Sequence, residues 1–138
     1  MGRKSPANLG SAMAVLLSLV AACQPIGPAV PVSARADFAE NCATCHGDSG
    51  HGNGPAAAGL SRKPADLTGI AARNGGEFPM ARVMSTINGY FRPENGVMPH
   101  FGDILQSETV LVDTGDGIAT PAPERLVALA EYLRALQE

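Results

Sequence analysis

The sequence predicts a small all-α fold of short helices, with a small β-hairpin before the last of them. Two segments carry apolar residues at helical spacing, 80–89 and 121–138, and a third, 34–41, is polar, Ala-rich and helical in character. The 138 residues include no Trp, two Tyr and four Phe, so the core has to consist mainly of aliphatic side chains and Ala. A chain of this length forms one small domain, and a buried prosthetic group would supply the apolar volume that its own side chains lack.

Residues 1–22 predict an export signal. Arg3 and Lys4 precede an apolar stretch from Ala12 to Ala22. This stretch is shorter than a typical membrane-spanning helix. Positive charge followed by a short apolar stretch is the layout of a secretory signal. We therefore expect residues 1–22 to be removed during export.

The end of this signal, LSLVAAC, resembles the lipobox of bacterial lipoproteins. In that family small residues precede a cysteine that is lipidated and becomes the new N-terminus, and here that cysteine would be Cys23. The resemblance implies a lipid anchor on Cys23 and a location on the periplasmic side of a bacterial membrane. In the alternative interpretation a general signal peptidase cuts after Ala22 or at the A-x-A sequence of residues 34–36, and the protein is soluble in the periplasm.

We predict that residues 23–35 form a Pro-rich tether and that residues 36–138 form the folded domain. A Pro-rich, largely uncharged spacer is semi-rigid and would hold the domain away from the membrane. Removal of the signal also removes Arg3 and Lys4, so eight basic residues remain against thirteen acidic ones, a net charge of −5. This charge argues against nucleic acid as a partner.

Cys42, Cys45 and His46 lie within five positions, in the sequence CATCH. If residues 37–45 are helical, these three side chains lie at i, i+3 and i+4 and project from one side of the helix. One flat ligand can then contact all three. C-x-x-C-H is the attachment sequence of c-type haem, in which the two thiols add to the vinyl groups and the histidine binds the iron.

Three other kinds of site use some of the same residue types. A thioredoxin-like redox pair follows a β-strand, whereas ARADFAEN before this motif is helical in character. A zinc site needs four ligands, and His46 directly after Cys45 is badly placed to share a tetrahedron with both thiols. A structural disulfide does not explain the adjacent histidine. We therefore favour haem.

The resemblance extends beyond this motif. CATCHGDSGHGNGPAAAGL, KPADL, VMSTINGY and NGVMPHF, followed by an amphipathic C-terminal helix, resemble the class I monohaem cytochromes c over nearly all of 36–138. The resemblance implies about four short helices wrapped around one covalent haem c, held by Cys42 and Cys45 with His46 as an axial iron ligand. In such folds a Gly-rich loop leaves the haem-binding helix and passes along the haem edge. Four glycines permit the positive φ values and close approach that this needs: Gly47, Gly50, Gly52 and Gly54.

The second axial ligand has five candidates, which are Met80, Met84, Met98, His51 and His100. Met80 and Met84 recur with Val83 and Ile87 at helical spacing, in a segment that ends at Gly89 as a helix C-cap would. We therefore interpret Met80 and Met84 as core residues. His51 would have to cross the haem plane to bind the far side, so we interpret it as a solvated loop histidine.

Met98 lies in a segment bounded by Pro93 and Pro99, where no helix can run. A flexible thioether on such a loop can reach the iron face opposite His46, and the Met-Pro-His-Phe run matches the ligand loop of the resembled family at Met98. We therefore predict Met98 as the second axial ligand, with His100 as the alternative. A thioether favours Fe(II) and raises the reduction potential.

The other ring nitrogen of an iron-bound histidine usually donates to a backbone carbonyl. The resemblance to the Pro-x-Leu segment of the family implies the carbonyl of Pro64, in KPADL, and Pro55 is the alternative. We expect three aromatic residues either to line the haem or to fill the core: Tyr90, Phe91 and Phe101.

The segment 121–138 predicts an amphipathic helix, because four leucines follow one another at steps of three, four and three: Leu126, Leu129, Leu133 and Leu136. In the resembled fold this helix crosses the N-terminal one, with Phe38 and Tyr132 as contact partners. Before it, within an insertion at 104–120, TVLVDTGDGIAT has β-formers around a Gly/Asp turn and predicts a hairpin. The hairpin either covers a haem edge, docks a partner or is a surface elaboration.

We predict a one-electron carrier outside the cytoplasm and not an enzyme, because iron held by two axial ligands has no open coordination position. Its partners would be a redox protein donor and acceptor, with the membrane reached through Cys23. Two alternatives remain at this point. One is a haem subunit of a larger oxidoreductase, and the other is a haem sensor or enzyme in which Met98 is displaced from the iron.

Overall fold

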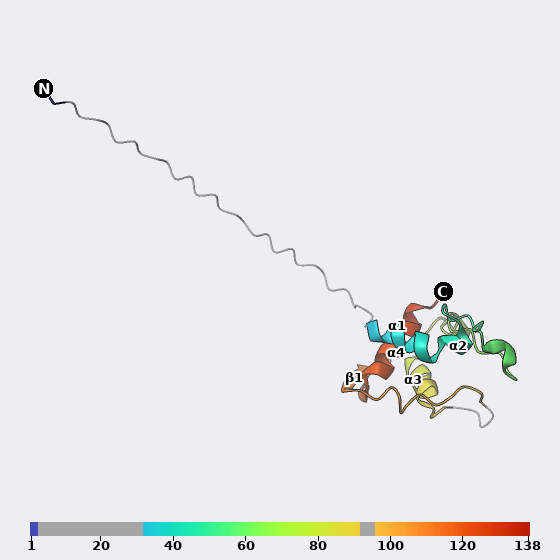
Figure 1. The fold of residues 1–138 in the computed structure, drawn as a ribbon. Helices are drawn as coiled ribbons and strands as arrows, with labels where there is room; N and C mark the ends of the chain where they lie inside the picture. The colour runs from blue at the N-terminus through green and yellow to red at the C-terminus, as the bar shows by residue number, and fades with distance from the viewer. Residues whose placement is uncertain (3–31, 92–95) are drawn as a thin grey trace.

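The computed structural model describes residues 1–2, 32–91 and 96–138. Residues 3–22 of the predicted signal and residues 23–31 of the predicted tether, Cys23 among them, therefore lie outside the described residues. Within the described residues the fold is mostly helical, with a two-stranded hairpin before the last helix (Figure 1), as the sequence predicts. In chain order the elements are α1 (Val32–Asn41), α2 (Ala43–His46), η1 (Ala57–Gly59), η2 (Ala72–Asn74), α3 (Met80–Asn88), β1 (Thr109–Asp113), β2 (Ala119–Pro123) and α4 (Glu124–Ala135).

Helices α1 and α2 form an almost continuous helix that is interrupted by a turn at Cys42. The amide of Cys42 donates to the carbonyl of Phe38 and the amide of His46 donates to that of Cys42, both at 2.9 Å. The i to i−4 pattern of an α-helix therefore continues across the turn. Helix α1 begins at Val32, so it includes 32–35, which we assigned to the tether. No helix in the described ranges is long and apolar enough to cross a bilayer.

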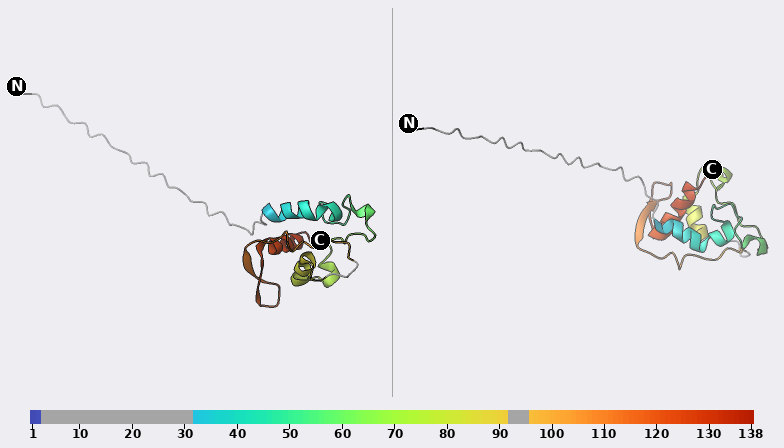
Figure 2. Two further views of the ribbon diagram at one scale, coloured as in Figure 1. Left: turned by 60° about the horizontal axis from the view of Figure 1, so that its bottom comes forward. Right: turned by 45° about the horizontal axis from the view of Figure 1, so that its top comes forward.

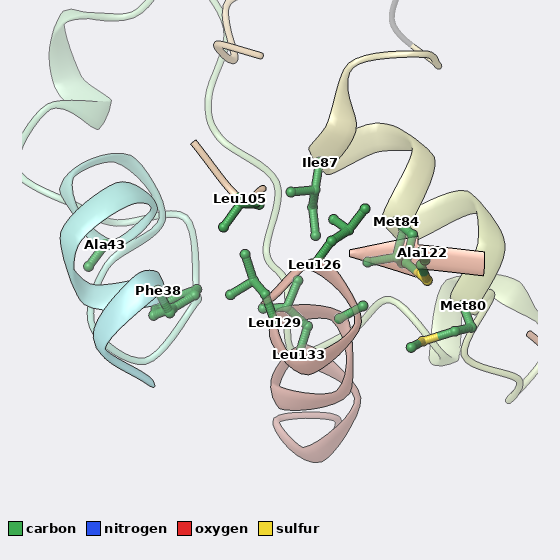
Figure 3. Close-up of a cluster of buried hydrophobic side chains, with 12 residues drawn as sticks. Phe38, Ala43, Met80, Met84, Ile87, Leu105, Ala122, Leu126, Leu129 and Leu133 are labelled. Carbon is green, nitrogen blue, oxygen red and sulfur yellow. The ribbon is translucent and has the colours of Figure 1, made fainter. Parts of the chain in front are cut away.

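The hydrophobic core lies between α1, α3 and α4 (Figure 3). Met80 and Met84 on α3 are buried in it, which confirms their interpretation as core residues. Three of the four predicted leucines of α4 are buried as well, while the fourth, Leu136, follows the end of the helix and is half-buried. The buried cluster comprises Phe38, Ala43, Met80, Val83, Met84, Ile87, Leu105, Ala122, Leu126, Leu129, Ala130 and Leu133.

Helix α1 packs against α4 (Figures 1 and 2). The rings of Phe38 and Tyr132 lie 5.3 Å apart with a tilt of 48°, which is a favourable geometry for an aromatic pair and confirms the predicted contact. At the same interface, the buried carboxylate of Asp37 accepts two hydrogen bonds from the guanidinium of Arg125, one of them 3.1 Å long. Apolar packing and a bidentate ion pair together fix the crossing of the first and last helices.

The hairpin packs on the end of the domain. Its strands are antiparallel, with Thr109 opposite Pro123 and Asp113 opposite Ala119. Asp113 shapes the turn, because its carboxylate accepts hydrogen bonds from the amides of Gly115 and Gly117. In the views of Figures 1 and 2 the hairpin lies at the opposite end of the domain from η1.

Candidate functional site

A cavity of about 400 Å³ opens beside α2, between the segments 60–65 and 96–101. Cys42, Cys45, His46 and Met98 all line it, so the cavity brings Met98 together with the three residues of the C-x-x-C-H motif, which lie far from it in the sequence. Its volume is in the range of small-molecule and cofactor sites. The remaining lining residues are mainly apolar, with a few charged side chains at the rim.

Both cysteines at this cavity are half-buried free thiols and are not joined to each other. Burial raises the pKa of Cys42 to about 11, and the nearby carboxylate of Asp37 and the Cys45 thiol contribute in the same direction. Cys42 is therefore protonated at neutral pH, which does not suit a redox-active pair that needs a low thiol pKa. Among the described residues, no three or more His, Cys, Asp and Glu side chains lie together as a site for a bare metal ion.

His46 is buried at the end of α2, and its Nδ1 lies 2.9 Å from the carbonyl oxygen of Ala65. A carbonyl can only accept a hydrogen bond, so Nδ1 carries the proton and Nε2 keeps the lone pair that binds a metal. The prediction of Pro64 or Pro55 as the acceptor is wrong. The acceptor is instead the carbonyl of the next residue after Pro64, Ala65, whose oxygen lies within hydrogen-bond distance of the ring.

The Gly-rich loop, residues 47–54, folds back on α2 before the chain reaches this acceptor. The amide of Gly52 donates to the carbonyl of His46 at 2.7 Å, and that of Gly54 donates to Cys45 at 3.1 Å, so the loop folds back on α2. Gly52 has a φ of +72°, and a Cβ there would lie 2.4 Å from the carbonyl oxygen of Pro64. Gly47 and Gly50 also have positive φ. Gly54 does not, and it is needed for close approach, because a Cβ there would lie 2.4 Å from the carbonyl oxygen of Thr44.

Met98 reaches the cavity from an irregular loop, as the flanking prolines predict. Its side chain is half-buried. Phe91 and Phe101 line the same cavity, whereas Tyr90 is 83% exposed and does not. The other apolar side chains of the lining are Leu60, Pro64, Ala65, Val97 and Pro99.

Neither of the other two histidines lines this cavity. His51 lies 3.4 Å from both the carboxylate of Asp66 and the hydroxyl of Thr68, and its side chain is 40% exposed. His100 is exposed, and its ring lies so close to Gly89 that a Cβ there would meet Nδ1 at 2.0 Å. Of the five candidates for a second axial ligand, Met98 is therefore the one that lines the cavity with His46.

The hairpin contributes no residue to the lining of the cavity. This position argues against the interpretation in which the hairpin covers one edge of the bound group. It packs instead against α4, where Ala122 is buried and Val112 lies against the core.

A mostly helical domain with a C-x-x-C-H helix over an apolar cavity has the form of a protein that binds haem covalently. The chain matches the cytochrome c family over residues 33–137 and belongs to that family. Membership implies a covalently bound haem c, and the family is typically made up of electron-transfer proteins. A comparison with curated proteins finds no match.

The residues present fit a haem c. Two free thiols at i and i+3 face the cavity, together with an imidazole whose Nδ1 is already held and a thioether from another segment. The walls are apolar, as a porphyrin requires. Arg62 and Lys63 lie at the rim, where their positive charge can meet the carboxylates of the porphyrin.

Proposed function

We propose that this protein is a one-electron carrier that holds a haem c through Cys42 and Cys45, with His46 and Met98 as the axial ligands of the iron. The observation that carries the proposal is that these four side chains line one apolar cavity, while the other histidines lie elsewhere. Bound in this way, the group supplies a reversible change between Fe(III) and Fe(II).

The side chains of this chain set the conditions for that change. Ala65 fixes the orientation and the tautomer of His46 and makes its imidazole a stronger electron donor. The thioether of Met98 has the opposite effect and favours Fe(II). Apolar walls, including Leu60 and Phe101, exclude water, which keeps the reorganisation that accompanies electron transfer small.

We propose further that the protein is exported and held on the periplasmic side of a bacterial membrane by a lipid on Cys23. The lipobox-like sequence LSLVAAC and the Pro-rich residues that follow it support this location. Redox proteins in the same compartment would be its electron donor and acceptor. At the cavity rim Phe91 is 71% exposed and Val97 42% exposed, so an apolar surface for brief docking lies beside the cofactor site.

Spectroscopy of the full chain, expressed in a bacterium that attaches c-type haem, tests the ligation. The proposal predicts a weak far-red absorption band of an iron–thioether bond in the ferric protein and slow binding of carbon monoxide to the ferrous protein. Rapid binding of carbon monoxide without that band would overturn the assignment of Met98 and favour a sensor or enzyme. Co-purification of a second chain would instead indicate a subunit of a larger oxidoreductase.

Membrane fractionation tests the location separately. The wild-type chain should be found with the membranes, and a Cys23→Ser variant should lose that association while it keeps its haem. Equal amounts of both in the soluble fraction would contradict the lipid anchor and leave the electron-transfer assignment intact.

A further inference from the structure

Gln137, which follows α4, bonds to the segment that carries Ala65. Its Nε2 donates to the carbonyl of Leu67 at 2.8 Å and to that of Leu133 at 2.7 Å. Its Oε1 accepts from the amide of Ala71 at 2.8 Å. Both donor hydrogens and the carbonyl of this side chain are therefore used, and they join α4 to a stretch that is 66 to 70 residues away in sequence.

Both the amide and the carbonyl of Leu67 are hydrogen-bonded to other parts of the fold. Its amide donates to the carbonyl of Gly50 at 2.7 Å, and its carbonyl accepts from Gln137. Residues 63–67 form neither helix nor strand, so the path of this segment depends on bonds from other parts of the fold. Ala65 lies two residues before Leu67, and its carbonyl position follows from where Leu67 is fixed.

We propose that Gln137 is a positioning residue for the imidazole of His46, acting through Leu67 and the carbonyl of Ala65. This inference rests on the proposed ligation of iron by His46. A firm hydrogen bond at Nδ1 makes an imidazole a better electron donor, which favours Fe(III) and lowers the reduction potential. Loss of the Gln137 hydrogen bonds should let residues 65–71 move. This movement should weaken the bond between His46 and Ala65 and raise the reduction potential.

Gln137→Met tests the inference, because it keeps the side-chain length and the neutral charge and removes all three hydrogen bonds. The control is Leu126→Val, which trims a buried core side chain in the first turn of α4, beside the hairpin, and removes no hydrogen bond of Gln137. Both variants are made in the full haem-loaded chain. Reduction potentials are measured by spectroelectrochemistry, and the ring signals of His46 are followed by proton NMR of the ferric protein.

We expect Gln137→Met to shift the one-electron reduction equilibrium toward Fe(II) by up to tenfold, a rise of up to about 59 mV, and to move the His46 ring signals. Leu126→Val should lower the melting temperature and leave both readouts unchanged. A potential that is the same in all three proteins, or that shifts equally in both variants, would overturn the positioning role. A wild-type protein without haem, or without iron-shifted His46 signals, would refute the proposed function instead.

Hydrogen exchange in the wild-type holoprotein gives a second test that holds even if Gln137→Met does not fold. The amide of Ala71 and the Nδ1 hydrogen of His46 should exchange through the same local opening and show equal protection. Retention of the His46 hydrogen after Ala71 has exchanged would show that the two contacts open independently, and the inference would fall.

Discussion

The Nδ1 of His46 lies 2.9 Å from the carbonyl oxygen of Ala65, across 19 residues of sequence. This bond joins the C-x-x-C-H helix to the irregular segment that follows the Gly-rich loop. It determines which ring nitrogen is free to bind a metal, because Nδ1 must carry the proton. The loop between the two residues is therefore as much a part of the proposed site as the ligands.

Gly52→Ala should damage both the fold and the haem environment. The residue has a φ of +72°, and its Cβ would lie 2.4 Å from the carbonyl oxygen of Pro64 and 3.2 Å from that of Ala65. We expect a loss of roughly 1–3 kcal/mol in unfolding free energy and a rise in reduction potential, since the Ala65 carbonyl would be pushed from His46. Gly59→Ala is the matched control, because its Cβ would meet nothing within 4 Å. Equal unfolding curves for the two variants would contradict this view of the loop.

Met98→Ala should abolish the far-red band of the ferric protein, lower the reduction potential and open the ferrous iron to carbon monoxide. On the proposed ligation, this substitution removes the thioether that stabilises Fe(II) and occupies the sixth position of the iron. Met80→Leu removes a sulfur from the core at a cost below about 1.5 kcal/mol and should leave the spectrum unchanged, since Met80 is buried away from the cavity lining. Persistence of the band in Met98→Ala would assign the sixth position to another residue.

Asp66 gives a pH-dependent prediction. Hydrogen bonds from the hydroxyl and then the amide of Thr68, at 2.7 and 2.9 Å, lower the pKa of Asp66 to about 2. A carboxyl with a lowered pKa stabilises the fold above its unfolded pKa, near 3.8, and this contribution is lost as the pH falls through about 2. Thr68→Val should therefore raise the Asp66 titration midpoint and narrow the acid range in which the fold is stable.

Carboxyl NMR titration of the two proteins measures this shift. Asp113 serves as an internal control, because the amides of Gly115 and Gly117, which lower its pKa, are unaffected by the substitution. An Asp66 midpoint that stays near 2 in Thr68→Val would show that the hydroxyl is not the main cause.

The ion pair between Asp37 and Arg125 should contribute more to stability than the surface pair between Glu131 and Arg134. The Asp37 side chain is only 7% exposed, whereas that of Glu131 is 34% exposed. Asp37→Asn weakens charged hydrogen bonds across the α1–α4 interface and should cost about 1–3 kcal/mol, while Glu131→Gln should cost at most about 0.5 kcal/mol. Chemical denaturation measures both, and a larger loss for Glu131→Gln would contradict the comparison.

Much of the fold could be predicted because its signals are local. The spacing of Met80 and Met84 with their apolar neighbours predicts α3, and the leucines of α4 predict a helix whose buried face the structure confirms. The hairpin was also predictable, since Gly and Asp at its turn lie between β-forming residues. In each case the residues that determine the element are those that form it.

The contacts that the sequence did not predict depend on backbone atoms that are distant in the sequence. The acceptor for His46 is a carbonyl, which every residue possesses, so nothing in the identity of Ala65 marks it. Resemblance to the family located the neighbourhood of Pro64 but missed the acceptor by one residue. Gln137 gave no signal either, because its partners become neighbours only after α4 has packed against the rest of the domain.

Intact-mass spectrometry of the mature protein tests the central claim most directly. We predict the mass of the polypeptide plus one haem, with both thiols consumed, and loss of that added mass when Cys42 and Cys45 are both replaced by serine. A colourless wild-type protein with the mass of the polypeptide alone, or with a disulfide between Cys42 and Cys45, would contradict the account.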